Sequence, residues 1–534
     1  MFSFSIGSPD TTPNTFRTRL KTFLENTTVH CYRYLVEDHR SKWEIFLWII
    51  VHAIFAFCSV TIVINSWIGF TENPLMTKLH TTLYPSSKVA FPGIAICNVN
   101  RISRRAAVRF AEELRAKDKH PEMKRDTQFY LKQIKLLASM YTYDYVNEID
   151  LIEFQRILDE VYEESELTLM NDIMNRLTPR CEDMLLRCFW QSKEVKCIGG
   201  PFALFESRRT EYGICCSFNY IIKPNNVVGN SRKATFTGPE MGLFVLVHGQ
   251  PEDYFYQMAS TRGFIVLVHN AFDFPDIPSG NVNQVHVRLG KETHIRVDSH
   301  YIFPDEFIEN YKPATRKCIF PKEMGTKYGG TYAKSQCISY CRIQSILALC
   351  DCVPFSLPAD LFYNKTDSLQ ICNLNHVPCL NRYRIKWLTI STETLYVKGL
   401  EREREESLLC EDCLPCCFDN KYRATYSSLP LHVSKRKGTH IMESVKNVSQ
   451  TALIRVFFGS PNTWAYMQTV QMTWFEIISN FGGIFGVLLG FSMLSLIEII
   501  YFVVREIYYW LVEKWHHHRL HETITEHGGM VIVP

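Results

Sequence analysis

The chain has 534 residues, 58 basic and 55 acidic side chains, and a formal net charge of +3. So small an excess of positive charge argues against a nucleic acid as partner. The length is sufficient for several domains. No phosphate-binding glycine loop, Gly-x-Ser-x-Gly or His-Glu-x-x-His motif is present, so we do not expect an enzyme.

The first strongly apolar stretch runs from Ile45 to Ile64, interrupted only by His52 and Cys58. A helix of this length covers the hydrocarbon core of a bilayer, roughly 30 Å. No cleavable signal sequence precedes the stretch, but basic residues do: Arg33, Arg40 and Lys42. We predict a cytosolic N-terminal segment over residues 1–44 and a transmembrane helix over residues 45–66.

Residues 67–470 form a long loop that holds nearly all the cysteines. All but Cys31 and Cys58 of the 19 lie between Cys97 and Cys417. This density is typical of an oxidising compartment, and it predicts an extracellular domain with a disulfide framework.

Two short motifs in the loop bear on its chemistry. Zinc is an alternative for the closely spaced cysteines 410–417, but we expect no metal because the compartment favours disulfides. Asn364-Lys-Thr and Asn447-Val-Ser are acceptors for N-glycosylation.

The loop begins with helical patterns. Residues 101–135 are basic and helix-prone from Arg101 onward, and residues 144–166 carry many carboxylates with apolar residues at helical spacing. Two amphipathic helices with solvated charged faces account for these patterns. The alternative is a carboxylate cluster that titrates and couples pH to gating.

The remainder of the loop mixes strands with one helix. Residues 213–300 show strand patterns, residues 335–352 a helical one with Cys337 and Cys341 on one face, and residues 452–458 a last strand before the membrane. Strands of this type are clearest at Leu243–His248, Gly263–His269 and Val285–Leu289. We therefore predict an α+β domain whose sheet receives strands from both ends of the loop.

A second apolar run, from Ile477 to Ile497, contains no charge and is long enough to span a bilayer as one helix. It carries an unusual number of small residues: Gly482, Gly483, Gly486, Gly490 and Ser492. One interpretation is a small-residue face that lets helices pack closely. The other is that Gly490-Phe491-Ser492 leaves the helix and turns backbone carbonyls toward a water-filled axis, as in ion filters.

Basic residues also follow this second run: Arg505, Lys514 and Arg519. Positive flanks on both outer ends predict that both termini are cytosolic, with a second span over residues 471–504 and a tail over residues 505–534. The His516–His518 run is interpreted as a solvated stretch near the membrane.

Several segments together resemble the degenerin/epithelial sodium channel superfamily, which includes the acid-sensing channels. The resemblance covers nearly all of residues 28–505. It rests on Phe91-Pro-Gly-Ile-Ala-Ile-Cys97-Asn98, Gly213-Ile-Cys-Cys-Ser-Phe-Asn219, Cys350-Asp-Cys352-Val-Pro354, Cys413-Leu-Pro-x-Cys417, and the series Gly482-Gly483, Gly486, Gly490-x-Ser492, Glu498. The adjacent cysteines 215 and 216 are most similar to the insect pickpocket branch.

The resemblance implies a trimeric plasma-membrane channel with two transmembrane helices per chain and a palm, thumb and finger ectodomain. It implies an amiloride-sensitive, sodium-selective cation channel subunit in sensory or epithelial cells, gated through the ectodomain, alone or with related subunits. Sodium is then the permeant ion, and no cofactor is expected. The stimulus stays open among protons, peptides, stretch, osmolarity and a lipid-like ligand.

The same resemblance assigns pore and gating residues. The selectivity filter would be Gly490, Phe491 and Ser492, with rings of Glu476, Asn480 and Glu498 along the pore. Ser479 falls where small residues permit pore closure. The cytosolic His-Gly gating pair of the family falls at His30-Cys31, where cysteine replaces glycine, and Gly93 replaces the alanine of the first signature.

The family's disulfides, transferred to matching positions, are Cys97–Cys215, Cys188–Cys197, Cys318–Cys417, Cys337–Cys413, Cys341–Cys410, Cys350–Cys379 and Cys352–Cys372. Cys181 and Cys216 remain as candidates for a further bond, and Cys416 is left odd.

Two other classes share the predicted topology. An ATP-gated trimeric channel would need a lysine-rich nucleotide pocket, and its second span would lack the Gly-x-Ser pattern. A non-conducting two-pass receptor would have no use for that pattern. Sodium current that amiloride blocks separates the three classes.

Overall fold

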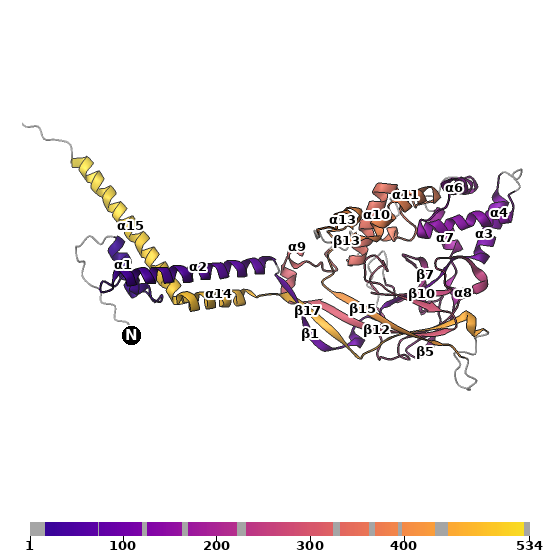
Figure 1. Ribbon diagram of the computed structural model, residues 1–534, viewed down its shortest axis with the longest axis horizontal. Coiled ribbons are helices and arrows are strands. Elements are labelled where there is room, and N and C mark those ends of the chain that lie inside the picture. The colour runs from indigo at the N-terminus through magenta and orange to yellow at the C-terminus, as the bar shows by residue number, and fades with distance from the viewer. Residues whose placement is uncertain are drawn as a thin grey trace, which may run out of the picture. The chain divides into compact units, whose positions relative to one another are not determined.

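The computed structural model describes residues 16–72, 74–119, 125–162, 169–221, 231–323, 332–362, 369–392, 398–432 and 447–527. The chain forms two compact units. The helical unit comprises the two ends of the chain, up to Met76 and from Val470, and the cysteine-rich unit comprises Thr77–Thr469 (Figure 1). The predicted glycosylation site Asn364 lies outside the described residues.

The described part of the helical unit is built from four α-helices and a short 3₁₀ turn: α1 (Phe16–Asn26), η1 (Tyr32–Leu35), α2 (Lys42–Glu72), α14 (Trp474–Leu489) and α15 (Met493–His527). Among the described helices, α2 alone is long and apolar enough to cross a membrane unaided. Many of its apolar side chains are exposed, Trp43 and Phe57 among them. A lipid environment is the one in which such a surface is stable.

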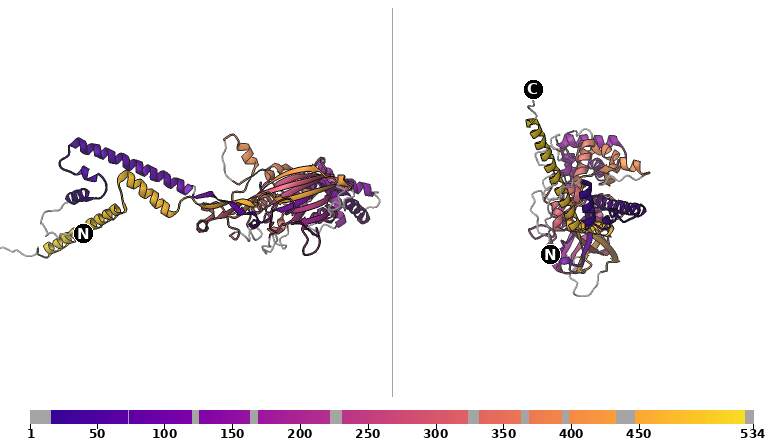
Figure 2. Two further views of the ribbon diagram at one scale, coloured as in Figure 1. Left: turned by 90° about the horizontal axis from the view of Figure 1, so that it is seen from below. Right: turned by 90° about the vertical axis from the view of Figure 1, so that its left-hand side faces the viewer.

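The second apolar run is not one continuous helix, as its length suggests. α14 and the first part of α15 are together long and apolar enough to span a bilayer. The two helices are bent by 79° relative to each other at the break between them (Figure 2). The helix is interrupted at Gly490-Phe491-Ser492, as the second of the two interpretations of this run expects, and the cause lies in the residues at the break.

The cysteine-rich unit contains a large and a smaller sheet. The large sheet has the order β1-β17-β12-β16-β8-β4-β5, with β15 also paired to β12, and the smaller one the order β11-β10-β2-β7-β6. The strands of the large sheet are β1 (Leu75–Pro85), β4 (Leu185–Trp190), β5 (Lys193–Val195), β8 (Leu243–His248), β12 (Lys291–Pro304), β15 (Asp419–Pro430), β16 (Thr451–Phe458) and β17 (Asn462–Val470). Those of the smaller sheet are β2 (Gly93–Asn98), β6 (Phe205–Thr210), β7 (Gly213–Phe218), β10 (Gly263–His269) and β11 (Asn283–Arg288).

The large sheet takes strands from both ends of the loop, as predicted, because β1 follows α2 in the chain and β17 precedes α14. The predicted last strand, residues 452–458, is β16, but β17 follows it and is the strand that leads into the second apolar segment. β17 pairs in parallel with β12. His300 lies opposite Trp464 at one end of the paired stretch, and Pro304 lies opposite Gln468 at the other.

Helices lie along one side of the cysteine-rich unit and the large sheet along the other (Figure 1). The main helices are α3 (Arg104–Lys117), α4 (Thr127–Ile134), α6 (Glu148–Tyr162), α7 (Leu169–Leu177), α10 (Lys334–Cys350) and α11 (Val377–Arg382). In α6 the apolar residues Leu151, Phe154 and Leu158 are buried, while Glu148 and Glu153 are exposed. This is the amphipathic arrangement that the spacing predicts.

Arg101 does not begin a helix. It lies on β3 (Asn100–Ser103), which pairs with β9 (Tyr254–Gln257), and α3 starts only at Arg104 with Ser103 as its N-cap. The Arg101 side chain is buried over the Tyr212 ring, 4.9 Å from its centroid. Burial lowers the pKa of this guanidinium to about 10.

Gly93, where the family signature has alanine, makes room for a histidine. Gly93 lies opposite His269 in the β2–β10 register, so the two residues share one face of the sheet. A Cβ at Gly93 would lie 2.5 Å from Cε1 of the buried His269 ring. Burial lowers the pKa of His269 to about 4, which keeps the ring neutral in the core.

We expect Gly93→Ala to destabilise the cysteine-rich unit by roughly 1–3 kcal/mol, because the core must absorb an overlapping methyl group. Thermal unfolding of the purified protein measures the effect. In the double variant Gly93→Ala/His269→Ala the methyl group finds space, so most of the loss is recovered. An unchanged melting temperature for Gly93→Ala alone would contradict this packing.

Candidate functional site: the broken second span and its N-terminal segment

The break in the second apolar segment begins at Gly490. This residue caps α14 in the left-handed region, with φ +62°. The Gly490 N–H still donates to the Gly486 carbonyl at 3.0 Å, and the Phe491 N–H donates to the Phe485 carbonyl at 3.1 Å. Glycine is the residue that adopts this conformation without a steric penalty, so it ends the helix where a larger residue would continue it.

Ser492 starts the next helix. Its hydroxyl accepts a hydrogen bond from the Ser495 N–H at 3.1 Å, and the Ser495 hydroxyl accepts one from the Ser492 N–H at 3.3 Å. A reciprocal arrangement of this kind satisfies donors that the first turn of a helix leaves unpaired. Gly490-Phe491-Ser492 is therefore a helix stop followed by a helix start.

The other glycines of α14 have open space beside them, where a side chain would lie. Among the described atoms, none lies within 4 Å of the place that a Cβ would take at Gly482 or Gly483. At Gly486 the nearest atom is the Phe491 carbonyl oxygen, at 3.8 Å. α14 thus presents a bare backbone surface, which another helix could approach closely.

The segment between α1 and η1 packs against the break. The His30 ring lies so close to Gly490 that a Cβ there would overlap it. One turn further along α15, Glu498 Oε2 accepts hydrogen bonds from the Thr28 N–H and hydroxyl, each at 3.0 Å, and from the Thr27 hydroxyl at 3.3 Å. The resemblance assigns Glu498 to a ring along the pore, and in the single chain its carboxylate accepts hydrogen bonds from the N-terminal segment.

Additional contacts place α1 along α15. Arg19 pairs with Glu506 at 3.0 Å, and the rings of Phe23 and Phe502 stack with centroids 4.4 Å apart. Because residues of α1 thereby touch residues of α15, the segment around His30 is held from both sides. No sequence pattern indicated α1 or these contacts.

Cys31, which stands where the family has glycine, has φ +65°. A residue with a Cβ pays roughly 1–2 kcal/mol in this region, and glycine pays almost none. A glycine at this position would adopt the turn without this cost, so Cys31 makes the turn a strained one in this chain.

For the channel that the resemblance implies, we expect Cys31→Gly to change the open probability by up to about fivefold, the factor that corresponds to about 1 kcal/mol of relieved strain. Single-channel recording measures it. Cys31→Ala is the matched control, since it removes the thiol but keeps the Cβ, and it should behave like the parent chain. If the glycine and alanine variants are indistinguishable, backbone strain at Cys31 has no role in opening.

The predicted outer pore residues lie on α14. Glu476 forms a capping box with Thr473, whose N–H donates to Glu476 Oε2 at 2.7 Å. Ser479 is exposed on the helix surface. Asn480 borders a cavity of about 200 Å³ that Ser66, Trp67 and Phe70 of α2 also line, so in the single chain it faces α2.

Within the described residues, eight disulfides hold the cysteine-rich unit. Seven are the pairs transferred from the family, Cys341–Cys410 included, and the eighth joins Cys181 to Cys216. Asn447, the second glycosylation candidate, caps the 3₁₀ turn Val448–Gln450, with its side chain accepting from the Ser449 N–H at 3.1 Å.

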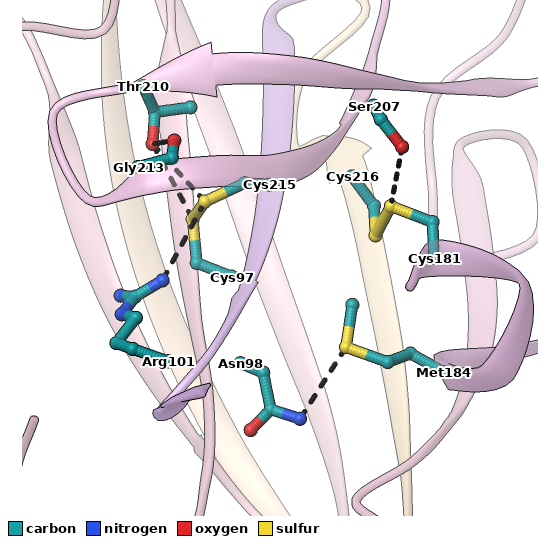
Figure 3. The surroundings of a disulfide bond; sticks show 10 residues. All are labelled: Cys97, Asn98, Arg101, Cys181, Met184, Ser207, Thr210, Gly213, Cys215 and Cys216. Carbon is teal, nitrogen blue, oxygen red and sulfur yellow. Dashed lines mark hydrogen bonds between the residues drawn. A yellow bond between two sulfur atoms is a disulfide. The ribbon is translucent and has the colours of Figure 1, made fainter. Parts of the chain in front are cut away.

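The adjacent cysteines of β7 form disulfides on opposite faces of the smaller sheet. Successive residues of a strand point to opposite faces of the sheet, so the side chains of Cys215 and Cys216 reach partners on different sides. Cys215 bonds Cys97 of β2, and Cys216 bonds Cys181 at the start of α8 (Cys181–Met184) (Figure 3). The signature motifs around Cys97 and Cys215 lie on the neighbouring strands β2 and β7. Ile94 lies opposite Phe218, and Ile96 lies opposite Cys216.

A buried ionic network, which no sequence motif indicated, joins α10 to the loop after β10. Arg342 of α10 pairs with Asp276 and, at 3.2 Å, with Glu211. Burial raises the pKa of Asp276, against the lowering effect of Arg342. Removing either partner would leave an uncompensated buried charge, so this network ties α10 to the sheets.

Comparison with known proteins decides the family. Residues 23–502 match the family described as amiloride-sensitive sodium channel. The chain belongs to this sodium channel family. It is therefore a subunit of a plasma-membrane cation channel with a disulfide-rich extracellular domain, and it is not an enzyme. Members of the family assemble as oligomers.

Individual relatives agree with this assignment. Pickpocket protein 28 of Drosophila melanogaster is 24% identical and aligns over 90% of this chain and 77% of its own length. Sodium channel protein Nach of Drosophila ananassae is 21% identical over 90% of this chain and 85% of its own. Bile acid-sensitive ion channel of Mus musculus is 22% identical over 80% of this chain and 75% of its own.

Proposed function

We propose that this sodium channel subunit forms a trimer whose three broken second spans line an amiloride-sensitive, sodium-selective pore. The observation that carries the proposal is the interruption of an apolar, bilayer-length segment at Gly490-Phe491-Ser492. Backbone outside a helix survives at membrane depth only beside protein or a water-filled cavity. Two spans per chain cannot enclose such a cavity, so several chains must surround it.

In this arrangement the carbonyls of Gly490 and Phe491 form rings that replace part of the hydration shell of sodium. The Ser492 hydroxyl caps α15, so its contribution to selectivity is chiefly to hold those carbonyls in place. The open surface at Gly482 and Gly483 supports close approach of the three α14 helices.

The same proposal assigns the other parts of the chain. Residues 45–66 and 471–504 cross the membrane, residues 67–470 are extracellular, and residues 1–44 and 505–534 are cytosolic. Glu476 and Asn480 lie toward the outer mouth. Glu498, which accepts three hydrogen bonds from Thr27 and Thr28, couples the cytosolic segment to the inner end of the pore.

Expression in an electrically silent cell, alone and with related subunits, tests the function. We expect an inward current that requires sodium and that amiloride blocks, under at least one of the candidate stimuli. Current that requires ATP would favour the ATP-gated class. Normal surface expression without current in every combination would favour a non-conducting receptor.

We expect Ser479→Val to produce a constitutive sodium current at least tenfold above that of the parent chain. Ser479 is exposed on α14, and a branched side chain there would keep the closed helices apart. Ile478→Val, at a neighbouring exposed position, is the matched control and should leave the resting current unchanged. A silent Ser479→Val channel with normal surface expression would contradict the placement of this gate.

A further inference from the structure

A small cavity in the cysteine-rich unit lies between α3 and the link from α7 to α8, and arginines form much of its lining. Its volume is about 50 Å³. A single water molecule needs roughly 10–15 Å³, so the cavity has room for a small polyatomic ion. The side chains around it include four guanidinium groups and one carboxylate; the lining residues are Ser103, Arg105, Ala106, Arg109, Arg176, Thr178, Arg180 and Asp183.

Asp183, the one carboxylate of the lining, pairs with two of the arginines. Its Oδ2 lies 3.7 Å from Arg105 Nη2 and 3.5 Å from Arg180 Nε. Arg105 has a second carboxylate partner, the buried Asp253, at 3.3 Å from its Nε. These contacts are made by Nε and Nη2 of the two arginines, so the Nη1 donors of both are left for another acceptor.

The other two arginines of the cavity are less well neutralised. Arg176 pairs through Nη2 with Glu113 and lies over the Phe110 ring, 5.5 Å from its centroid. Glu113 also pairs with Lys117 at 3.0 Å, so its charge is shared between two cations. The exposed Arg109 side chain forms no ion pair or hydrogen bond in the described part of the chain. The carboxylates in contact with the cavity's arginines therefore leave an excess of positive charge.

The donors around the cavity favour an anion that carries several oxygens. Like charges that share a cavity repel one another, and an anion among them relieves the repulsion. Guanidinium groups present their N–H donors in a planar fork that fits the oxygens of sulfate, phosphate and carboxylate groups. The buried Ser103 hydroxyl accepts a hydrogen bond from the Ala106 N–H at 3.2 Å, and its own proton is left as a further donor. Donors that converge from several sides match a tetrahedral ion better than a flat one.

We propose that this cavity binds a tetrahedral oxyanion, a sulfate or phosphate group. Arg109 and the Nη1 groups of the other three arginines donate to its oxygens. The group is either a free ion or the end of a larger molecule, such as a sulfated sugar. The bound ion joins α3 to the link between α7 and α8, which leads into the Cys181–Cys216 disulfide. The inference does not depend on conduction.

Binding is tested by calorimetry on the purified full-length protein in detergent. Sodium sulfate is titrated while sodium chloride keeps the ionic strength constant, because added salt alone screens exposed charges. We expect saturable binding of sulfate and a higher melting temperature in its presence. The absence of saturable sulfate binding would overturn the proposal.

Two variants locate the site. Arg109→Gln and Arg104→Gln remove the same charge from exposed positions of α3, and of the two residues Arg109 alone lines the cavity. We expect at least a tenfold loss of sulfate affinity in Arg109→Gln and less than a twofold loss in Arg104→Gln. Melting temperatures without sulfate show that each variant is folded. Equal losses in the two variants would mean a diffuse attraction to the charge of α3, and no loss in either would place the ion elsewhere; both results contradict the proposal.

A sulfated sugar identifies the source of the oxyanion. The probe is N-acetylglucosamine 6-sulfate, with N-acetylglucosamine as its uncharged counterpart. Tighter binding of the sulfated sugar than of inorganic sulfate indicates that the site takes the end group of a larger molecule, and equal or weaker binding indicates a free ion; either result supports an oxyanion site. If the sugar without sulfate binds as tightly as the sulfated one, the oxyanion is not what the cavity recognises.

Discussion

Gly490→Ala is expected to reduce the sodium current at least tenfold. The alanine would have to adopt φ +62°, which costs roughly 1–2 kcal/mol in each subunit. Its methyl group would also overlap the His30 ring. Both effects act on the one step in the second span where the backbone leaves the helix, so the carbonyls of Gly490 and Phe491 lose their position. Patch-clamp recording with surface labelling separates lost conduction from lost expression.

Two further substitutions make this result specific. Gly69→Ala, in α2, is the matched control for a glycine in a helix, because no described atom lies within 4 Å of the added methyl group. Ser492→Ala introduces no larger side chain, but it removes the hydroxyl that caps α15, at a cost of about 1 kcal/mol. This variant should change the sodium-to-potassium permeability ratio. If Gly490→Ala and Ser492→Ala both conduct with the parent ratio, the filter lies elsewhere.

Removing the Cys181–Cys216 bond is the second substitution with a large expected effect. The bond closes a loop with a sequence separation of 35 residues, which corresponds to about 3–4 kcal/mol of stability in the chain-entropy account. We expect the double variant Cys181→Ala/Cys216→Ala to melt at a clearly lower temperature and to reach the cell surface less often. Replacing both cysteines avoids a free thiol that could pair wrongly.

Cys416→Ala provides the control for this experiment, because it removes a cysteine that forms no disulfide. Its melting temperature should stay near that of the parent chain. A double variant as stable as Cys416→Ala would mean that the Cys181–Cys216 bond contributes nothing to the folded state.

Local sequence determined the elements that depend on short-range physics. The alternating or continuous apolar runs at Leu243–His248 and Gly263–His269 are strands with those same bounds. The apolar run after Ile45 is the helix α2, and Gly490 and Ser492 are residues that stop and start helices. The signature motifs and their cysteine spacings were sufficient to indicate the family, since residues this far apart are unlikely to match together without common descent.

Only the tertiary structure decided what these residues touch. Nothing in the sequence shows that His30 lies against Gly490, that Thr27 and Thr28 bind Glu498, or that Arg101 is buried beside Tyr212. Local propensity acts over a few residues, whereas these contacts join segments that are far apart in the chain. The sequence therefore indicated the family and offered a break at Gly490-Phe491-Ser492 as one of two interpretations of the second apolar run. The tertiary structure showed the break there, and the packing of distant segments decided what is held at it.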